Sequence, residues 1–227
     1  MSKALILVGG GKGGVGKSLF SMAAVDFLES SGANPFLIET DTSVPDVFKA
    51  YRETIAGEVV NLDEREGWIE LVNLVESRPE NPVVINTGAR NQTGITNFGR
   101  TLRKALPGLK RKLAAFWLID RKRESLELLA DFAEALPEAE IHVVRNLYLG
   151  TEAKFELYNG SKMRAAIEKA GGRSLNFPEL ADRVTDAMNK GRLTIAKACK
   201  ELSFGDRIEV ERWRDECKEM FGETVHE

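Results

Sequence analysis

A glycine-rich segment near the start of the chain carries its clearest chemical signal. Residues 11 to 18 read Gly-Lys-Gly-Gly-Val-Gly-Lys-Ser and fit the pattern G-x-x-x-x-G-K-[ST]. The glycines let successive backbone N–H groups turn toward one anion, Lys17 can reach the β and γ phosphates of a nucleotide, and Ser18 can bind Mg²⁺. The pattern predicts nucleotide contacts from Gly11, Lys12, Gly13, Gly14, Val15, Gly16, Lys17 and Ser18, and Leu19, the next residue, is a further candidate.

The sequence on either side of this segment is what a phosphate-binding loop requires. The apolar run 4–8 precedes it and predicts a short buried strand, while the apolar residues between 19 and 28 predict a buried helix. Such a helix points the positive end of its dipole at the phosphates. A tight turn with a chance Lys-Ser pair is the alternative, and it explains neither flank.

Short apolar runs alternate with helical patterns along most of the chain. Prolines and glycines separate them, and the alternation is typical of a parallel sheet with right-handed crossovers. We therefore predict an α/β fold, a single P-loop NTPase domain with a mostly parallel twisted sheet and helices on both faces. The predicted strands are 4–8, 36–39, 83–86, 113–119 and 141–145, with a weaker one at 173–177. Ligands of such sheets bind beyond the carboxyl ends of the strands.

Lys12 is a second lysine within the loop. A further cation beside the same phosphates adds repulsion in an empty site unless it points elsewhere. The string from Lys12 to Ser18 closely resembles the deviant Walker A motif of the ParA/MinD family of ATPases, which belong to the SIMIBI class of P-loop NTPases. The resemblance implies an ATP-bound homodimer in which Lys12 contacts the nucleotide of the other subunit, much as an arginine finger does. The alternative is a solvated loop lysine.

Two carboxylates follow the second predicted strand. Glu39 and Asp41 are two residues apart on an extended chain and so point to the same side, toward the phosphates. The resemblance implies that Asp41 orients the attacking water and, with Ser18, holds Mg²⁺, which gives Lys12, Lys17 and Asp41 as the catalytic set. The alternative is that Asp41 starts a turn or caps the next helix.

Two positions depart from the family pattern. Asn86 follows the third predicted strand, where the family has the Walker B aspartate, and Leu19 stands where many relatives have a hydroxyl. Asn lacks the negative charge of a carboxylate but can still accept a hydrogen bond from a metal-bound water. Either Glu39 and Asp41 supply the lost charge, or the protein binds ATP well and hydrolyses it slowly.

The predicted base pocket follows the last two strands. Asn146 matches the position at which the family's asparagine reads adenine. A side-chain amide suits a purine edge because it offers both a donor and an acceptor. Phe177 and Pro178 are candidates for the other wall. Each of these residues also has an ordinary interpretation as part of a loop at a strand end.

Basic residues concentrate between 100 and 123. Nine Lys/Arg stand there against a single acid, Asp120, for a local net charge of +8 in a chain whose overall net charge is −3. Such a cluster is typical of a polyanion partner, and the resemblance implies binding to DNA without sequence preference. The candidates for DNA binding are Arg100, Arg103, Lys104, Lys110, Arg111 and Lys112. The alternatives are a solvated surface or, for residues 121–123, a dimer interface.

Composition places the chain among intracellular proteins. Cys199 and Cys217 are far apart and form no C-x-x-C pair, so we expect reduced thiols and a cytoplasmic location. We predict one domain over 1–227, with 206–227 as a C-terminal helical extension. That extension has eight acidic residues against four basic ones, a balance that disfavours an anionic membrane surface, so no membrane partner is expected.

These features favour an ATP-dependent dimerisation switch, a slow ATPase with ATP and Mg²⁺ as cofactors. We expect it to position DNA or a DNA-associated complex and to respond to a stimulating partner protein. The residues 39–47 look most like the ParA-like proteins of plasmid partition, mobilisation or conjugation. The alternative is a metabolic ligase on the same fold, of the dethiobiotin synthetase or cobyrinic acid amidase type, against which Lys12 argues. Redox and metal-carrier relatives on this fold would need cysteines after the middle strands to hold a cluster, and Cys199 and Cys217 lie in a different region.

Overall fold

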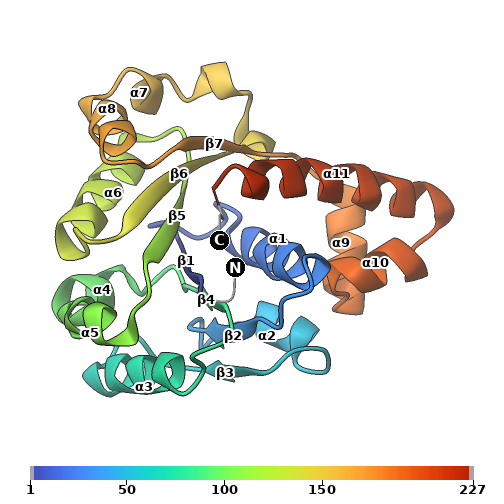
Figure 1. Cartoon of the computed structure of the whole chain (residues 1–227). Helices are drawn as coiled ribbons and strands as arrows, with labels where there is room; N and C mark the ends of the chain where they lie inside the picture. Colours follow the sequence, from blue (N-terminus) through green and yellow to red (C-terminus); the bar gives the residue numbers. More distant parts are fainter. Residues whose placement is uncertain (1–2, 225–227) are drawn as a thin grey trace.

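Seven strands form one parallel sheet at the centre of the molecule (Figure 1). The computed structural model describes residues 3–224. The strands lie in the order β3-β2-β4-β1-β5-β6-β7, and every neighbouring pair is parallel. Their bounds are β1 Leu5–Gly9, β2 Phe36–Glu39, β3 Gly57–Val59, β4 Val83–Asn86, β5 Leu113–Ile119, β6 Glu140–Asn146 and β7 Ser174–Phe177. This arrangement confirms the predicted α/β fold class.

Helices cover both faces of the sheet. One face carries α1 Lys17–Ser30, α2 Asp46–Tyr51, α9 Asp182–Gly191, α10 Ile195–Glu201 and α11 Phe204–Gly222. The other carries α3 Arg65–Glu76, α4 Gln92–Phe98, α5 Arg100–Leu109, α6 Arg123–Ala135, α7 Glu156–Asn159 and α8 Lys162–Lys169. Two 3-10 turns, η1 Leu147–Leu149 and η2 Glu152–Lys154, follow β6.

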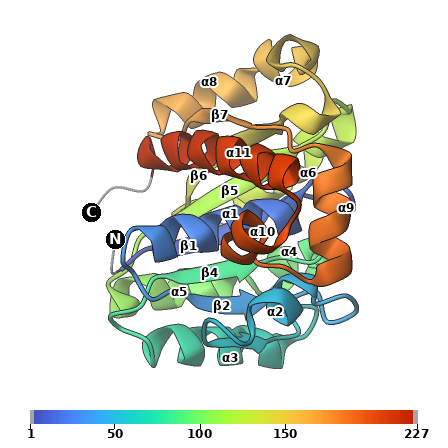
Figure 2. The ribbon, with the colours of Figure 1, turned by 90° about the vertical axis from the view of Figure 1, so that its right-hand side faces the viewer.

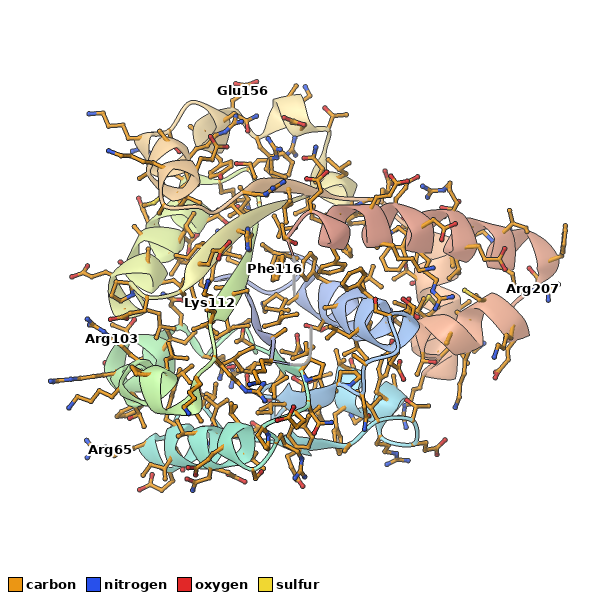
Figure 3. The ribbon with its side chains drawn as sticks, viewed as in Figure 1. Arg65, Arg103, Lys112, Phe116, Glu156 and Arg207 are labelled. Atoms are coloured by element: carbon orange, nitrogen blue, oxygen red, sulfur yellow. The ribbon has the colours of Figure 1, made fainter. Side chains whose placement is uncertain are left out.

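The alternation of side chains along each strand divides the core into two layers. On β1, Ile6 and Val8 pack in the layer beneath α1 and α11, whereas Leu5 and Leu7 pack in the layer beneath α3, α5 and α6. Phe116 of β5 lies in the first of these layers, between the sheet and α1 (Figure 3). Both faces are therefore buried, which explains why the central strands are continuous apolar runs.

Most of the predicted strands agree closely with the structure. The strands at 36–39, 83–86 and 113–119 match to the residue, and the others differ by one residue at one or both ends. The prediction missed β3, because its three residues, Gly-Glu-Val, are partly or fully exposed at the edge of the sheet and form no apolar run.

The C-terminal helix α11 packs against α1 and β7 (Figure 2). The Trp213 indole N–H donates to the Pro178 carbonyl at 2.9 Å, and the ring of Phe221 lies 5.1 Å from that of Phe20. Arg214 pairs with Asp26 of α1 at 2.7 Å. The helix begins two residues before the predicted extension, 206–227, and covers 206–222 of it, while residues 225–227 lie outside the described part. No helix within residues 3–224 is long and apolar enough to span a membrane.

Replacing Trp213 by Ala should lower the free energy of unfolding by about 3–5 kcal/mol, because a fully buried ring leaves a cavity and the Pro178 carbonyl loses its donor. Phe204→Ala on the same helix is the matched control. Its ring is 72% exposed, so the expected change is within about 0.5 kcal/mol. Denaturant unfolding measures both. A loss of stability for Trp213→Ala that is no larger than that for Phe204→Ala would contradict the packing of Trp213 in the core.

Candidate functional site

The glycine-rich loop joins β1 to α1 at the carboxyl edge of the sheet. Gly14 and Gly16 have φ of +77° and +100°, a left-handed region that favours glycine, and α1 begins at Lys17 directly afterwards. The Lys17 ammonium donates to the Lys12 carbonyl oxygen at 2.8 Å. Burial lowers the pKa of Lys17 to about 8, against the opposing effect of Asp41. An anionic phosphate beside Lys17 would restore the charged form.

Asn146, at the end of β6, holds this loop from beneath. Its amide donates to the Val15 carbonyl at 3.0 Å and accepts from the Tyr148 N–H at 3.1 Å. A Cβ at Gly16 would collide with the same amide, so the glycine is required by close approach as well as by φ. Both polar atoms of Asn146 are thus engaged with backbone. A role in reading adenine stays a prediction and would require at least one of these bonds to be exchanged.

Phe177 is not positioned as predicted. Its ring is 1% exposed and packs in the core against Phe20 and Trp213, so it cannot form a wall of a base pocket from this position. Pro178 is also buried, and it lines a separate cavity beside Leu147. The strand-end position was predicted correctly, but in this short strand the apolar side chain at 177 turns to the core layer.

The acids after β2 differ in their surroundings. Glu39 is fully buried, and one of its carboxylate oxygens accepts from the Asp41 N–H at 3.0 Å. Asp41 is half-buried and accepts from the backbone N–H groups of Ser43 and Val44 at 3.1 and 3.0 Å. Asp41 therefore closes a turn, as the alternative reading expected, and it also lines the cavity next to the phosphate loop.

Asn86 connects Glu39 to α1. Its side-chain N–H donates to the same Glu39 oxygen at 2.8 Å, and its carbonyl accepts from the Ser21 hydroxyl at 2.8 Å. A carboxylate at position 86 could accept from Ser21 but could not donate to Glu39, so two buried acids would face each other. The amide is therefore the side chain that suits a glutamate on β2.

The second oxygen of Glu39 has no hydrogen-bond partner among the described residues. Burial raises the pKa of Glu39 to about 7, and the Asp41 N–H and Asn86 amide oppose that rise. A buried acceptor without a donor is costly, and a hydrated divalent cation would satisfy it. Ser18 and Asp41 line the adjacent cavity, so the oxygen donors present fit Mg²⁺, which keeps several of its own waters.

A hydrogen-bonded group joins the loops after β2 and β4. The Thr40 hydroxyl lies 2.6 Å from the Asn91 side-chain oxygen, which also accepts from the Gly88 N–H at 2.6 Å. The Asn91 amide in turn donates to Asp63 at 3.0 Å. A displacement of either loop would therefore move the other. Sequence reasoning did not identify Asn91, because no motif marks it.

A cavity of about 490 Å³ opens over the phosphate loop. Loop residues 13, 14 and 16–19, together with Asp41 and Asn86, contribute to its walls, as expected for a ligand site at the carboxyl ends of parallel strands. Two further walls come from α2 and α9, which sequence reasoning did not assign. The sequence does contain a pattern that could have indicated the α9 wall. Residues 185, 189 and 192 are polar, and their spacing of four and three residues places them on one helical face.

Lys12 does not line this cavity but turns toward α6. Its ammonium pairs with Glu124, in the first turn of α6, and lies 3.9 Å from Asp120. The hydrogen bond to Glu124 raises the pKa of Lys12 above its ordinary value. The two lysines of the loop thus point to different places, with Lys17 toward the cavity of its own subunit and Lys12 along the surface.

The basic cluster does not form one patch. Arg111 is buried, and its guanidinium donates to the carbonyls of Ala4, Arg78 and Asn81, so it stabilises the base of the sheet and cannot contact DNA. This corrects the prediction for Arg111. The seven residues of β5 separate 110–112 from 121–123 by roughly 23 Å along the strand.

The remaining candidates lie on α5 and at the start of β5. Arg100, Lys104, Lys110 and Lys112 are exposed, whereas Arg103 is engaged with Glu138 at 2.6 Å. Figure 3 shows Arg65 of α3 and Arg103 of α5 extending from the same side of the molecule. Arg100 and Lys104 line a shallow hollow together with Arg65. DNA binding by this surface stays a prediction.

Glu39 should make the metal-free protein more stable as the pH falls. Its folded pKa of about 7 is above the ordinary 4.5, so the folded state binds the proton more tightly. The free energy of unfolding should therefore rise by about 2–3 kcal/mol between pH 8 and pH 5, and Glu39→Gln should remove this component. Urea unfolding in EDTA across that range measures it. Glu58→Gln, on the exposed edge strand, is the control. If the stability of Glu39→Gln varied with pH as that of the wild-type protein does, the pH dependence could not be assigned to Glu39.

The chain is 53% identical to protein MobD of Acidithiobacillus ferrooxidans over 227 residues, which cover 100% of both chains. No protein-family model matches it.

Solved structures of other proteins share the fold. MinD cell division protein of Aquifex aeolicus superimposes with a TM-score of 0.59 at 13% identity, covering 98% of this chain and 99% of that one. A putative plasmid partition protein of Borrelia burgdorferi B31, bound to AMPPNP, gives 0.59 at 16% identity with the same coverage. At such identities the likeness shows the P-loop NTPase fold of the MinD/ParA type. The full-length identity shows descent, and the chain belongs to the family of protein MobD.

Proposed function

We propose that this protein is an ATP-dependent dimerisation switch, a slow ATPase that positions DNA or a DNA-associated complex in plasmid partition or mobilisation. The observation that carries the proposal is the division of the two loop lysines. Lys17 faces the cavity of its own subunit, while Lys12 lies on the surface in contact with Glu124. A cation in that position is available to the nucleotide of a second subunit.

In this scheme different residues of the chain bind the phosphates, hold the metal and orient the attacking water. Backbone N–H groups of the loop and Lys17 bind the phosphates, and Ser18, Asp41 and Glu39 hold Mg²⁺, directly or through its waters. Mg²⁺, when bound, neutralises phosphate charge. Asp41, at the cavity wall, orients the attacking water, so that catalysis depends on positioning and electrostatics.

Slow turnover follows from the amide at the end of β4. Asn86 supplies no negative charge, and its two polar groups are engaged with Ser21 and Glu39. The anionic support for the metal then comes from Glu39 at the end of β2 and from Asp41 in the loop that follows it. A switch needs the ATP-bound state to persist long enough to act, and slow hydrolysis provides that persistence.

The similarity to known proteins supports the same reading. Protein MobD is identical at about half of all positions along the full length, and a fold neighbour is described as a putative plasmid partition protein bound to AMPPNP. The exposed basic residues of α5 and the start of β5 are the surface proposed for DNA.

Lys12→Ala should abolish ATP-dependent dimerisation while nucleotide binding is partly retained, because Lys17 remains in the cavity. Asp41→Ala should instead trap the dimer, since ATP is bound but the attacking water is not oriented. Light scattering after size exclusion, with ATP, ADP and no nucleotide, measures both, together with the ATPase rate. Lys169→Ala, an exposed lysine of α8, is the control. A Lys12→Ala protein that pairs normally would refute the role in the second subunit.

Replacing Arg100 and Lys104 by Ala should weaken binding of nonspecific duplex DNA in the ATP state several-fold. It should also lower the slope of log K against log salt by up to about 2, since each phosphate contact contributes about 0.9. Lys162→Ala with Lys169→Ala on α8 removes the same charge elsewhere. DNA affinity that is independent of nucleotide, or insensitive to salt, would remove this part of the proposal.

A further inference from the structure

One face of α9 forms a wall of the cavity over the phosphate loop. Thr185, Met188, Asn189 and Arg192 line it, spaced by three, one and three residues, so they share one side of the helix. Figure 2 shows α9 beside α10, near one end of the strands. The wall is polar where Thr185, Asn189 and Arg192 contribute and apolar at Met188.

Arg192 ends α9 in a left-handed conformation, with φ of 48° and ψ of 43°. The Leu193 N–H donates to the Met188 carbonyl at 2.9 Å, and the Arg192 N–H donates to that of Asn189 at 3.2 Å. These bonds form a helix end at which glycine is the usual residue. Thr194 then caps α10 by accepting from the Lys197 N–H at 3.2 Å. The backbone at 192 is therefore fixed from both sides.

Arg192 is an exposed cation at the wall of the cavity. Among residues 3–224 it forms no ion pair, although Asp41 and Asp46 line the same cavity. Lys17 and Arg192 are the two cations among the described residues that line this cavity, whereas Lys12 is engaged by Glu124 on the α6 side. A second cation strengthens the binding of a highly charged anion, and Arg192 is the other cation that lines this cavity among the described residues.

We propose that Arg192 is a nucleotide-binding residue, which contacts a phosphate of the nucleotide bound in its own subunit. The inference rests on the proposed function and adds a residue that no motif marks. It divides the cations by state: Lys17 and Arg192 hold nucleotide in the monomer, and Lys12 adds its charge when two subunits meet.

A favourable interaction with the negative end of the α9 dipole is the competing explanation for Arg192. That role would change the stability of the nucleotide-free protein and leave nucleotide affinity unaffected. Affinity and stability therefore have to be measured on the same variants.

The test is calorimetric binding of MgADP, which requires no dimer. Arg192→Asn removes the charge while Asn tolerates the left-handed backbone, and Arg192→Lys keeps the charge. Lys190→Asn removes an exposed cation from the same helix outside the cavity and is the matched control. We expect about tenfold weaker MgADP binding for Arg192→Asn, partial recovery for Arg192→Lys, wild-type binding for Lys190→Asn, and unchanged unfolding midpoints without nucleotide.

Wild-type MgADP affinity in Arg192→Asn would overturn the inference, as would an equal loss in Lys190→Asn or a loss matched by lower stability of the nucleotide-free protein. These outcomes are distinct from failure of the proposed function. If Arg192→Asn binds MgADP normally and dimerises with ATP, the switch stands without this residue. If the wild-type protein binds no nucleotide, the proposed function itself fails.

Discussion

The hydrogen bonds of the Asn86 amide connect the parts of the site to one another. The amide donates to Glu39 on β2 and accepts from Ser21 on α1, the helix that starts at the phosphate loop. Only a side chain with both a donor and an acceptor can bridge these two groups. The residue type at position 39 therefore restricts the residue type at position 86. A glutamate on β2 requires a hydrogen-bond donor opposite it, and a second acid on β4 would not provide one.

This coupling places a buried carboxylate of the site on β2 and none at the end of β4. Burial makes an ionised carboxylate costly at Glu39, and its pKa therefore rises to about 7. Its second oxygen also has no hydrogen-bond partner among the described residues, which adds to that cost. A divalent cation with its waters would relieve both conditions. The donor set at this strand end therefore suits a hydrated metal ion, and the link from Thr40 through Asn91 to Gly88 couples the strand end to the loop after β4.

Local patterns predicted the framework well, because strands buried on both faces are continuous apolar runs and the phosphate loop has a fixed spacing of residue types. The exposed edge strand β3 gave no such signal. Long-range contacts account for the other misses. Arg111 counted as surface charge in the sequence, yet its guanidinium binds carbonyls contributed by residues 4, 78 and 81. The burial of Phe177 depends on α11, whose docking no local pattern specifies.

The two lysines of the loop show why one motif can serve both binding and assembly. Lys17 is fixed toward the cavity by burial and by its bond to the Lys12 carbonyl, so its contribution belongs to one subunit. The Lys12 ammonium is partly exposed and pairs directly with the exposed Glu124, and such pairs at a surface exchange readily because solvent screens them. A second triphosphate carries a higher charge density than one carboxylate. Lys12 would therefore leave Glu124 only where another subunit brings a nucleotide, which makes assembly depend on ATP.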